Sequence, residues 1–215
     1  MTLAPREFDI VILGAGPVGA TLALLLAGSR HRILLVEQRE LSAGLQDPRA
    51  LALSEGARQL LDPYSAWPNT QDVGDDRCTP IKTIHISQSG GFGRTLIDRH
   101  DYRIPALGYV VRYSALIGGL HQALDRAIQR HGDRLVCLEK TTARVVETPA
   151  SETTHHSAGT GFWRHVELTD QGDPITIRTR LIVHAEGTPP DDSEGVIVRG
   201  YGQRAIIFEA SMAES

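Results

Sequence analysis

Several features that often decide a protein's class are scarce in this sequence. The 215 residues include only two cysteines, Cys78 and Cys137, which favours two reduced thiols over a disulfide framework or a thiolate metal site. The formal net charge is −4, so nothing in the composition points to nucleic acid as a partner. The longest apolar run, residues 20–27 with one threonine, is far too short to span a bilayer. Because the N-terminus also lacks the order of a signal peptide, we expect a soluble, cytoplasmic protein.

The clearest pattern is FDIVILGAGPVG at residues 8–19, where three glycines follow the spacing G-x-G-x-x-G. The β-branched run Phe8–Leu13 predicts a strand buried on both faces. Pro17 suits the first turn of a helix, and the apolar segment Val18–Ala27 continues that helix. A second strand is predicted at Ile33–Val36. The order is therefore strand, glycine turn, helix and strand.

Each part of this unit has a mechanical role in holding a dinucleotide. Gly14 allows the tight turn, Gly16 lets a pyrophosphate approach the backbone, and Gly19 lets the helix pack closely on the strand. The phosphates then lie against the free N–H groups of the helix N-terminus. Glu37 follows Gly19 by 18 residues and is placed to accept hydrogen bonds from the ribose hydroxyls, which favours FAD or NAD over NADP. The expected contacts are Gly14, Ala15, Gly16, Pro17, Val18, Gly19, Glu37 and Gln38.

A second candidate phosphate contact follows the unit. Arg49 lies just before a short helix, which we expect to begin after its cap Ser54 and to end near Leu61. An arginine here could neutralise the phosphates from the side opposite the first helix. The alternative is a solvated surface charge.

The glycine fingerprint, Glu37 and the run RALALS at residues 49–54 together resemble the FAD-dependent aromatic hydroxylases. Residues 81–87 and 102–111 are most similar to the ubiquinone-biosynthesis branch, which hydroxylates 2-polyprenyl-6-methoxyphenol. The resemblance runs from about Asp9 to the end of the chain.

The resemblance implies FAD as cofactor, NAD(P)H as electron donor and a prenylated phenol as substrate. Reduced FAD would react with O2 and transfer one oxygen atom to the electron-rich ring. Because the flavin carries this chemistry, no residue is named as catalytic and no metal is expected. Other ubiquinone-biosynthesis proteins, or peripheral contact with the inner membrane, are open as further partners.

The resemblance also implies particular contacts. It assigns Arg49 to the FAD phosphates and ribityl chain, and it places either Arg112 or Tyr113 beside the dinucleotide. The family's Asp-Gly pair reads Glu186-Gly187 here, after an apolar strand. The longer glutamate would have to fold back to reach the same partner. The alternative is a strand-end carboxylate in solvent.

The predicted fold class is α/β. We expect a Rossmann-like FAD-binding domain with a mainly parallel sheet, helices on both faces, a small antiparallel β-meander and the start of a substrate-domain sheet. Residues 1–195 would form the FAD-binding domain, with 78–112 partly on the substrate side, and 196–215 would begin the second sheet. The remaining predicted elements are a helix capped by Ser114 and ending near Arg130, and strands at Leu135–Glu147, Phe162–Thr169, Ile175–Val183 and Ala205–Glu209.

Family members carry a second flavin-binding segment and most of the substrate sheet in a later part. We therefore expect this chain to be an N-terminal portion, inactive alone, or a naturally shortened relative. Two other hypotheses stay open. One is an NAD-binding dehydrogenase or flavin reductase. The other is a catalytically silent dinucleotide-binding fragment or a partner in a complex.

Overall fold

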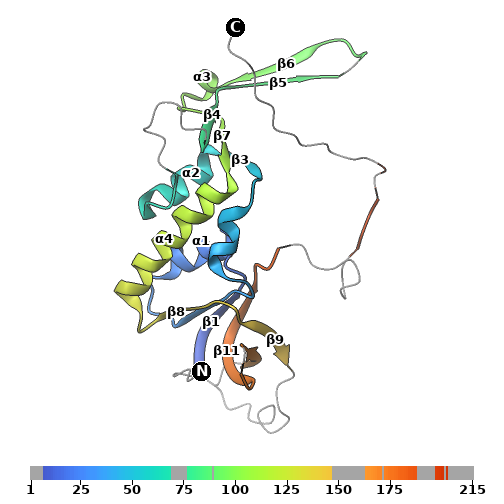
Figure 1. Ribbon diagram of the computed structural model, residues 1–215. Coiled ribbons are helices and arrows are strands. Elements are labelled where there is room, and N and C mark those ends of the chain that lie inside the picture. Colours follow the sequence, from blue (N-terminus) through green and yellow to red (C-terminus); the bar gives the residue numbers. More distant parts are fainter. Residues whose placement is uncertain are drawn as a thin grey trace, which may run out of the picture.

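The computed structural model describes residues 7–68, 77–88, 90–146, 163–170, 172–187, 197–200 and 202. Along the chain, the elements (Figure 1) are β1 (Glu7–Leu13), α1 (Pro17–Leu26), β2 (Ile33–Val36), the 3₁₀ helix η1 (Leu41–Gln46), β3 (Ala50–Ser54), α2 (Glu55–Leu61), the 3₁₀ helix η2 (Asp62–Tyr64), β4 (Cys78–Ile81), β5 (Thr83–Ser87), β6 (Arg94–Asp98), α3 (Arg99–Tyr102), β7 (Gly108–Arg112), α4 (Tyr113–His131), β8 (Leu135–Leu138), β9 (Thr142–Val146), β10 (Arg164–Thr169) and β11 (Ile175–His184).

The main sheet has six strands in the order β8-β2-β1-β11-β10-β9. The pairs β8-β2, β2-β1 and β1-β11 are parallel, whereas β11-β10 and β10-β9 are antiparallel. The antiparallel pairs join consecutive strands and form the expected meander. The predicted α/β class, with a mainly parallel sheet and a small meander, is confirmed.

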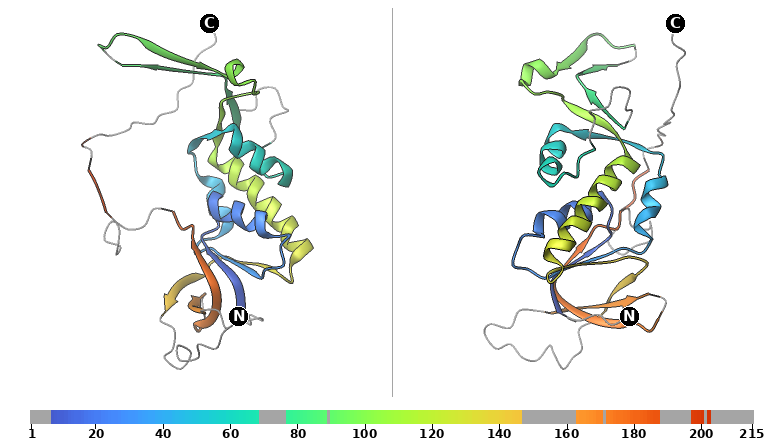
Figure 2. Two further views of the ribbon diagram at one scale, coloured as in Figure 1. Left: turned by 180° about the vertical axis from the view of Figure 1, so that it is seen from behind. Right: turned by 60° about the vertical axis from the view of Figure 1, so that its left-hand side comes forward.

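The two faces of the parallel strands enter separate cores because successive side chains alternate. Ile12 and Leu35 pack with α1 and α4 on one face. Val11 and Leu34 pack on the other face, where Val166 of the meander also lies. Figure 2 shows α1 and α4 on the same side of the sheet. Within the described residues, the expectation of helices on both faces is therefore wrong, since the meander supplies the apolar cover of the second face.

The turn between β1 and α1 requires glycine at two positions. Gly14 has φ +97°, and a Cβ there would lie 2.5 Å from the carbonyl oxygen of Ala185. A Cβ on Gly19 would lie 1.9 Å from the carbonyl oxygen of Gly14. The absence of both side chains lets the helix begin directly against the ends of β1 and β11, as the motif predicts.

A smaller antiparallel sheet, in the order β3-β7-β4, lies beyond the helices. Ser54 caps α2, because its Oγ accepts the Ala57 N–H at 3.2 Å, and the helix ends at Leu61 as predicted. Strands β5 and β6 pair only with each other among the described strands, and their hairpin projects from the far end of the molecule (Figure 1). No helix within the described ranges is both long and apolar enough to cross a membrane.

Three predicted boundaries are wrong. Ser114 does not cap α4, which begins at Tyr113 after the N-cap Arg112, because β7 runs directly into the helix. The strand predicted at 135–147 is two strands, β8 and β9, which the chain separates near Lys140, a residue with φ +54°. The strand predicted from Phe162 begins at Arg164. The strand predicted at 205–209 and the domain boundary at 195 lie outside the described residues, so both stay predictions.

Candidate functional site

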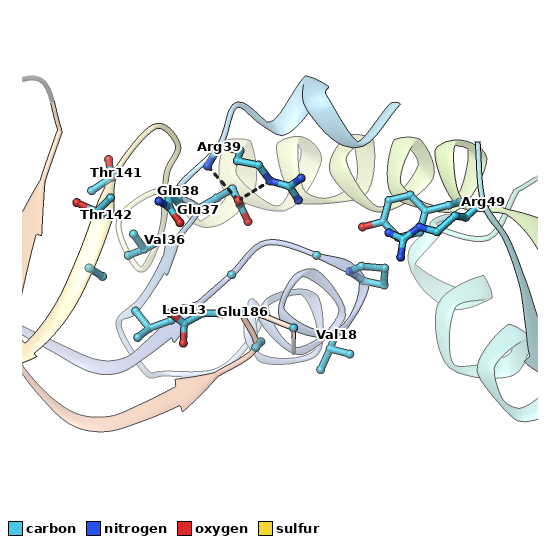
Figure 3. Close-up of a pocket in the computed structure, with 17 residues that line it drawn as sticks. Leu13, Val18, Val36, Glu37, Gln38, Arg39, Arg49, Thr141, Thr142 and Glu186 are labelled. Carbon is cyan, nitrogen blue, oxygen red and sulfur yellow. Dashed lines mark hydrogen bonds and ion pairs between the residues drawn. The ribbon is translucent and has the colours of Figure 1, made fainter. Parts of the chain in front are cut away.

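A pocket of about 530 Å³ lies where the carboxyl ends of β1, β2 and β11 meet. Strand β1 leads through α1 to β2 on one side and pairs with β11 on the other, so the pocket occupies the point where the strand order reverses. Ligands of open α/β sheets bind in this place. Figure 3 shows Thr141 and Thr142 at one end of the pocket and Arg49 at the other, with Glu37 between them. The site is therefore elongated.

Glu37 fixes the glycine turn. Its Oε2 accepts the Ala15 N–H at 2.8 Å, and its Oε1 accepts the Arg39 N–H at 3.0 Å. The carboxylate is only 15% exposed, and Arg39 adds an ion pair at 3.8 Å. Glu37 thus links the end of β2 to the turn after β1, in addition to the ribose contact that the sequence predicts.

The turn leaves open space where a phosphate would approach. Apart from Gly16 and its two chain neighbours, no atom of the described residues lies within 4 Å of the position that a Cβ on Gly16 would take. Helix α1 begins at Pro17, which has no N–H, and the N–H groups of Val18 and Gly19 are in the first turn, where no intrahelical carbonyl reaches them. Gly16, Pro17 and Val18 all line the pocket. This is the geometry of an anion site at a helix N-terminus.

Arg49 lines the pocket in contact with two other side chains. Its guanidinium donates to Asp47 from Nε and Nη2, at 2.9 and 2.6 Å, and lies 5.0 Å from the centre of the Tyr113 ring. These hydrogen bonds lower the pKa of the Asp47 carboxyl and raise that of Arg49. The arginine is therefore held at the pocket by Asp47 and Tyr113.

Glu186 and Gly187 also line the pocket, at the end of β11. The Glu186 Oε2 lies 2.8 Å from Nδ1 of His184, and its side chain is 55% exposed. The Cα of Glu186 lies 3.0 Å from the Cβ that Gly14 lacks, so the backbone of this residue touches the glycine turn. A ribose contact by Glu186 stays a prediction.

The structure brings most of the predicted site residues together. Those that line the pocket are Gly14, Gly16, Pro17, Val18, Glu37, Gln38, Arg49, Glu186 and Gly187. Ala15 lies within the turn and lines a small neighbouring cavity, and Gly19 lets α1 approach the backbone of Gly14. Arg112 is absent from the described lining. Tyr113, the alternative at that position, lines the pocket instead.

Sequence reasoning missed one wall of the pocket, formed by Thr141, Thr142 and Ala143. The Thr141 N–H donates to the Glu37 carbonyl at 3.0 Å, which holds this segment beside the end of β2. The contact depends on the pairing of β2 with β8. No local pattern in the sequence predicts this pairing. Within the described residues, no group of three metal-ligating side chains gathers at this or any other place.

No protein-family model matches the chain. An uncharacterised protein of Synechocystis is 27% identical over 215 residues, covering 96% of this chain and 46% of that protein. A ubiquinone hydroxylase of Neisseria meningitidis is 24% identical over 161 residues, covering 67% of this chain and 31% of the hydroxylase. The chain thus spans less than half the length of these curated relatives.

Among solved structures, p-nitrophenol 4-monooxygenase of Pseudomonas putida is similar to 90% of this chain. The TM-score is 0.60 at 14% sequence identity, and the match covers 45% of that enzyme. At this identity the likeness shows the fold. The arrangement of sheet, helices and meander is therefore shared with the matched part of that structure.

Proposed function

We propose that this chain is the FAD-binding part of a flavin-dependent aromatic hydroxylase. The observation that carries the proposal is the elongated pocket at the reversal of strand order. There the Glu37 carboxylate, the glycine turn and the Arg49 guanidinium all line one cavity. A dinucleotide can use these three groups for its ribose, its phosphates and the charge beyond them.

The residues fit FAD when its adenosine lies toward Thr141 and Thr142. Glu37 then faces the ribose, and Gly16 and Val18 present backbone to the pyrophosphate. Arg49 lies at the opposite end of the pocket (Figure 3), which is the end where we propose that the ribityl side of FAD lies. Bound FAD supplies the redox chemistry, including the reaction with O2 and oxygen transfer to an electron-rich ring. The chain's own residues bind and orient the cofactor, and Asp47 and Tyr113 hold Arg49 in place for this task.

Within this class, we propose a prenylated phenol of ubiquinone biosynthesis as substrate and NAD(P)H as donor. The 24% identity to a ubiquinone hydroxylase, over two thirds of the chain, supports this branch. Incubation of the protein with FAD, NADH or NADPH, O2 and a prenylated phenol tests it, with mass spectrometry for a product carrying one added oxygen atom. Product formation at an enzyme-like rate would contradict the expectation that this chain is inactive alone, whereas donor oxidation that yields only hydrogen peroxide is the result expected of an N-terminal portion.

Cofactor binding is tested separately by titrating the purified chain with FAD and following the quenching of flavin fluorescence. We expect saturable binding that ADP competes away, because the adenosine and pyrophosphate contacts dominate this pocket. A separate titration with NADH tests the dehydrogenase hypothesis against the FAD-binding proposal. Saturable NADH binding without FAD binding would contradict the proposal.

A further inference from the structure

The peptide groups on both sides of Ala15 are held by side chains from different elements. Glu37, at the end of β2, accepts the Ala15 N–H at 2.8 Å. His121, on α4, lies with Nε2 3.2 Å from the Ala15 carbonyl oxygen. His121 and Ala15 are 106 positions apart in the sequence. Neither the Glu37 contact nor the His121 contact belongs to regular secondary structure.

The Ala15 carbonyl needs a partner outside the helix. The first intrahelical bond of α1 runs from the Ala20 N–H to the Gly16 carbonyl at 2.9 Å, so the carbonyl of Ala15 precedes the helical ladder. Ala15 is only 2% exposed, and a buried carbonyl without a partner is costly. The half-buried His121 supplies that partner if its Nε2 carries the proton.

The orientation of this carbonyl determines the direction of the next N–H. In a trans peptide, the C=O of Ala15 and the N–H of Gly16 point in opposite directions. With the carbonyl drawn toward His121, the Gly16 N–H is directed away from that side chain, and Gly16 lines the pocket. Tyr113 and Ile117 precede His121 by eight and four residues on α4 and, with it, line a small cavity that Gly16 and Glu37 also line. That face of α4 therefore lies against the turn, next to the main pocket.

We infer that His121 is a positioning residue for the phosphate turn. By donating to the Ala15 carbonyl, it fixes the peptide plane that presents the Gly16 N–H to a ligand pyrophosphate. Glu37 fixes the preceding plane from the opposite end. This inference rests on the proposed dinucleotide function, and it adds a residue from α4 that the glycine fingerprint does not contain.

The test compares His121→Gln with His121→Met in the full chain. Glutamine carries an N–H donor at the same number of bonds from Cα as Nε2 of histidine, whereas methionine has nearly the same length without a donor. We expect His121→Met to weaken FAD and ADP binding roughly three- to tenfold, the range for one lost hydrogen bond. His121→Gln should bind like the wild type. The thermal midpoints without ligand are measured for all three proteins.

The outcomes separate the inference from the proposed function. If the wild type binds neither FAD nor ADP, the proposed function fails. If the wild type binds and His121→Met binds equally well, or if His121→Gln loses affinity as much as His121→Met, the positioning role is wrong. Rescue by glutamine supports it, because a purely space-filling role would not distinguish the two variants.

A measurement on the wild type keeps the inference testable if His121→Met fails to fold. Long-range ¹H–¹⁵N NMR of the imidazole identifies which ring nitrogen carries the proton. We expect a protonated Nε2, together with a shift of the Gly16 amide resonance when ADP is added. A neutral ring protonated only at Nδ1 cannot donate to the Ala15 carbonyl and would overturn the inference.

Discussion

At the residue scale, Glu37 combines two roles that do not compete. Each of its carboxylate oxygens accepts one backbone N–H, from Ala15 and from Arg39. An ionised carboxylate has about four acceptor sites, so each oxygen retains capacity for a ribose hydroxyl. The ligand contact that the sequence predicts and the turn contact that the structure shows are therefore compatible. Under the proposed function, one residue therefore holds the turn and contacts the ribose.

Gly16→Val should abolish FAD binding without unfolding the chain. The backbone at Gly16 has φ −66° and ψ −176°, which valine adopts readily. Apart from the chain neighbours of Gly16, no atom of the described residues lies within 4 Å of the new Cβ. The side chain would instead occupy the space that the pyrophosphate needs. Flavin fluorescence quenching measures the loss, and circular dichroism checks the fold. The matched control is Gly28→Val, where the new Cβ also has open space but lies outside the pocket. Stoichiometric FAD on a folded Gly16→Val protein would disprove the assignment.

Glu37→Gln should weaken FAD binding by roughly 1–3 kcal/mol. The amide has one acceptor oxygen instead of two, so its NH₂ group faces the N–H of either Ala15 or Arg39. Titration with FAD measures the change. The control is Glu167→Gln on β10, whose carboxylate pairs with Arg144 at 3.2 Å and does not line the pocket. Equal affinities for wild type and Glu37→Gln would contradict the proposed ribose contact of Glu37.

At the element scale, the sequence predicts the βαβ unit well because its signals are local. Pro17 marks the start of α1, and the run Ile33–Val36 is β2 as predicted. The start of α4 is not predicted correctly, since it depends on contacts made across the chain. The Tyr113 N–H donates to the Arg49 carbonyl at 2.8 Å, so a backbone group next to β3, rather than a side-chain cap, satisfies this N–H at the helix start. The threonine wall of the pocket is missed for the same reason.

A buried carboxylate in the first turn of α2 gives a pH-dependent prediction. Glu55 is 5% exposed and accepts hydrogen bonds from Arg58, the shortest at 2.7 Å, and from Gln59 at 3.1 Å. The hydrogen bonds from Arg58 are the main cause that lowers the pKa of the Glu55 carboxyl below its ordinary value of 4.5. A lowered folded pKa means that the stabilisation is complete above that ordinary value. It is lost as the pH falls through the folded pKa.

Glu55→Gln should therefore reduce the free energy of unfolding by about 1–3 kcal/mol at neutral pH and less in acid. Urea unfolding between about pH 6 and pH 3 measures the difference. The control is Glu40→Gln, which removes an exposed ion pair with Lys140 at 3.1 Å and should change stability little. A difference between wild type and Glu55→Gln that is constant across this pH range would contradict the prediction.

At the scale of the whole molecule, one core joins parts that the topology keeps separate. The cluster around α1 and α4 contains Ile12 and Leu35 of the main sheet together with Cys78 and Val111 of the smaller sheet. Cys137 of β8 packs against the same cluster. Because both sheets share this apolar contact, we expect them to unfold in a single transition rather than as two units.

The two cysteines allow a direct test of this cooperativity. Cys78 is 4% exposed, and burial raises the pKa of the Cys137 thiol to about 12, so neither supplies an accessible thiolate in the folded protein. In Cys137→Ser the remaining thiol reports on the smaller sheet, and in Cys78→Ser it reports on the main sheet. We expect a chromogenic disulfide reagent to label each thiol slowly without denaturant. Each labelling midpoint in urea should then coincide with the circular dichroism midpoint of the same variant. If Cys78 became reactive at clearly lower urea than the loss of secondary structure, the smaller sheet would open independently. In that case the shared core would not couple the two sheets. Arg49, just before β3, could then separate from Glu37, at the end of β2, while the parallel strands stay folded.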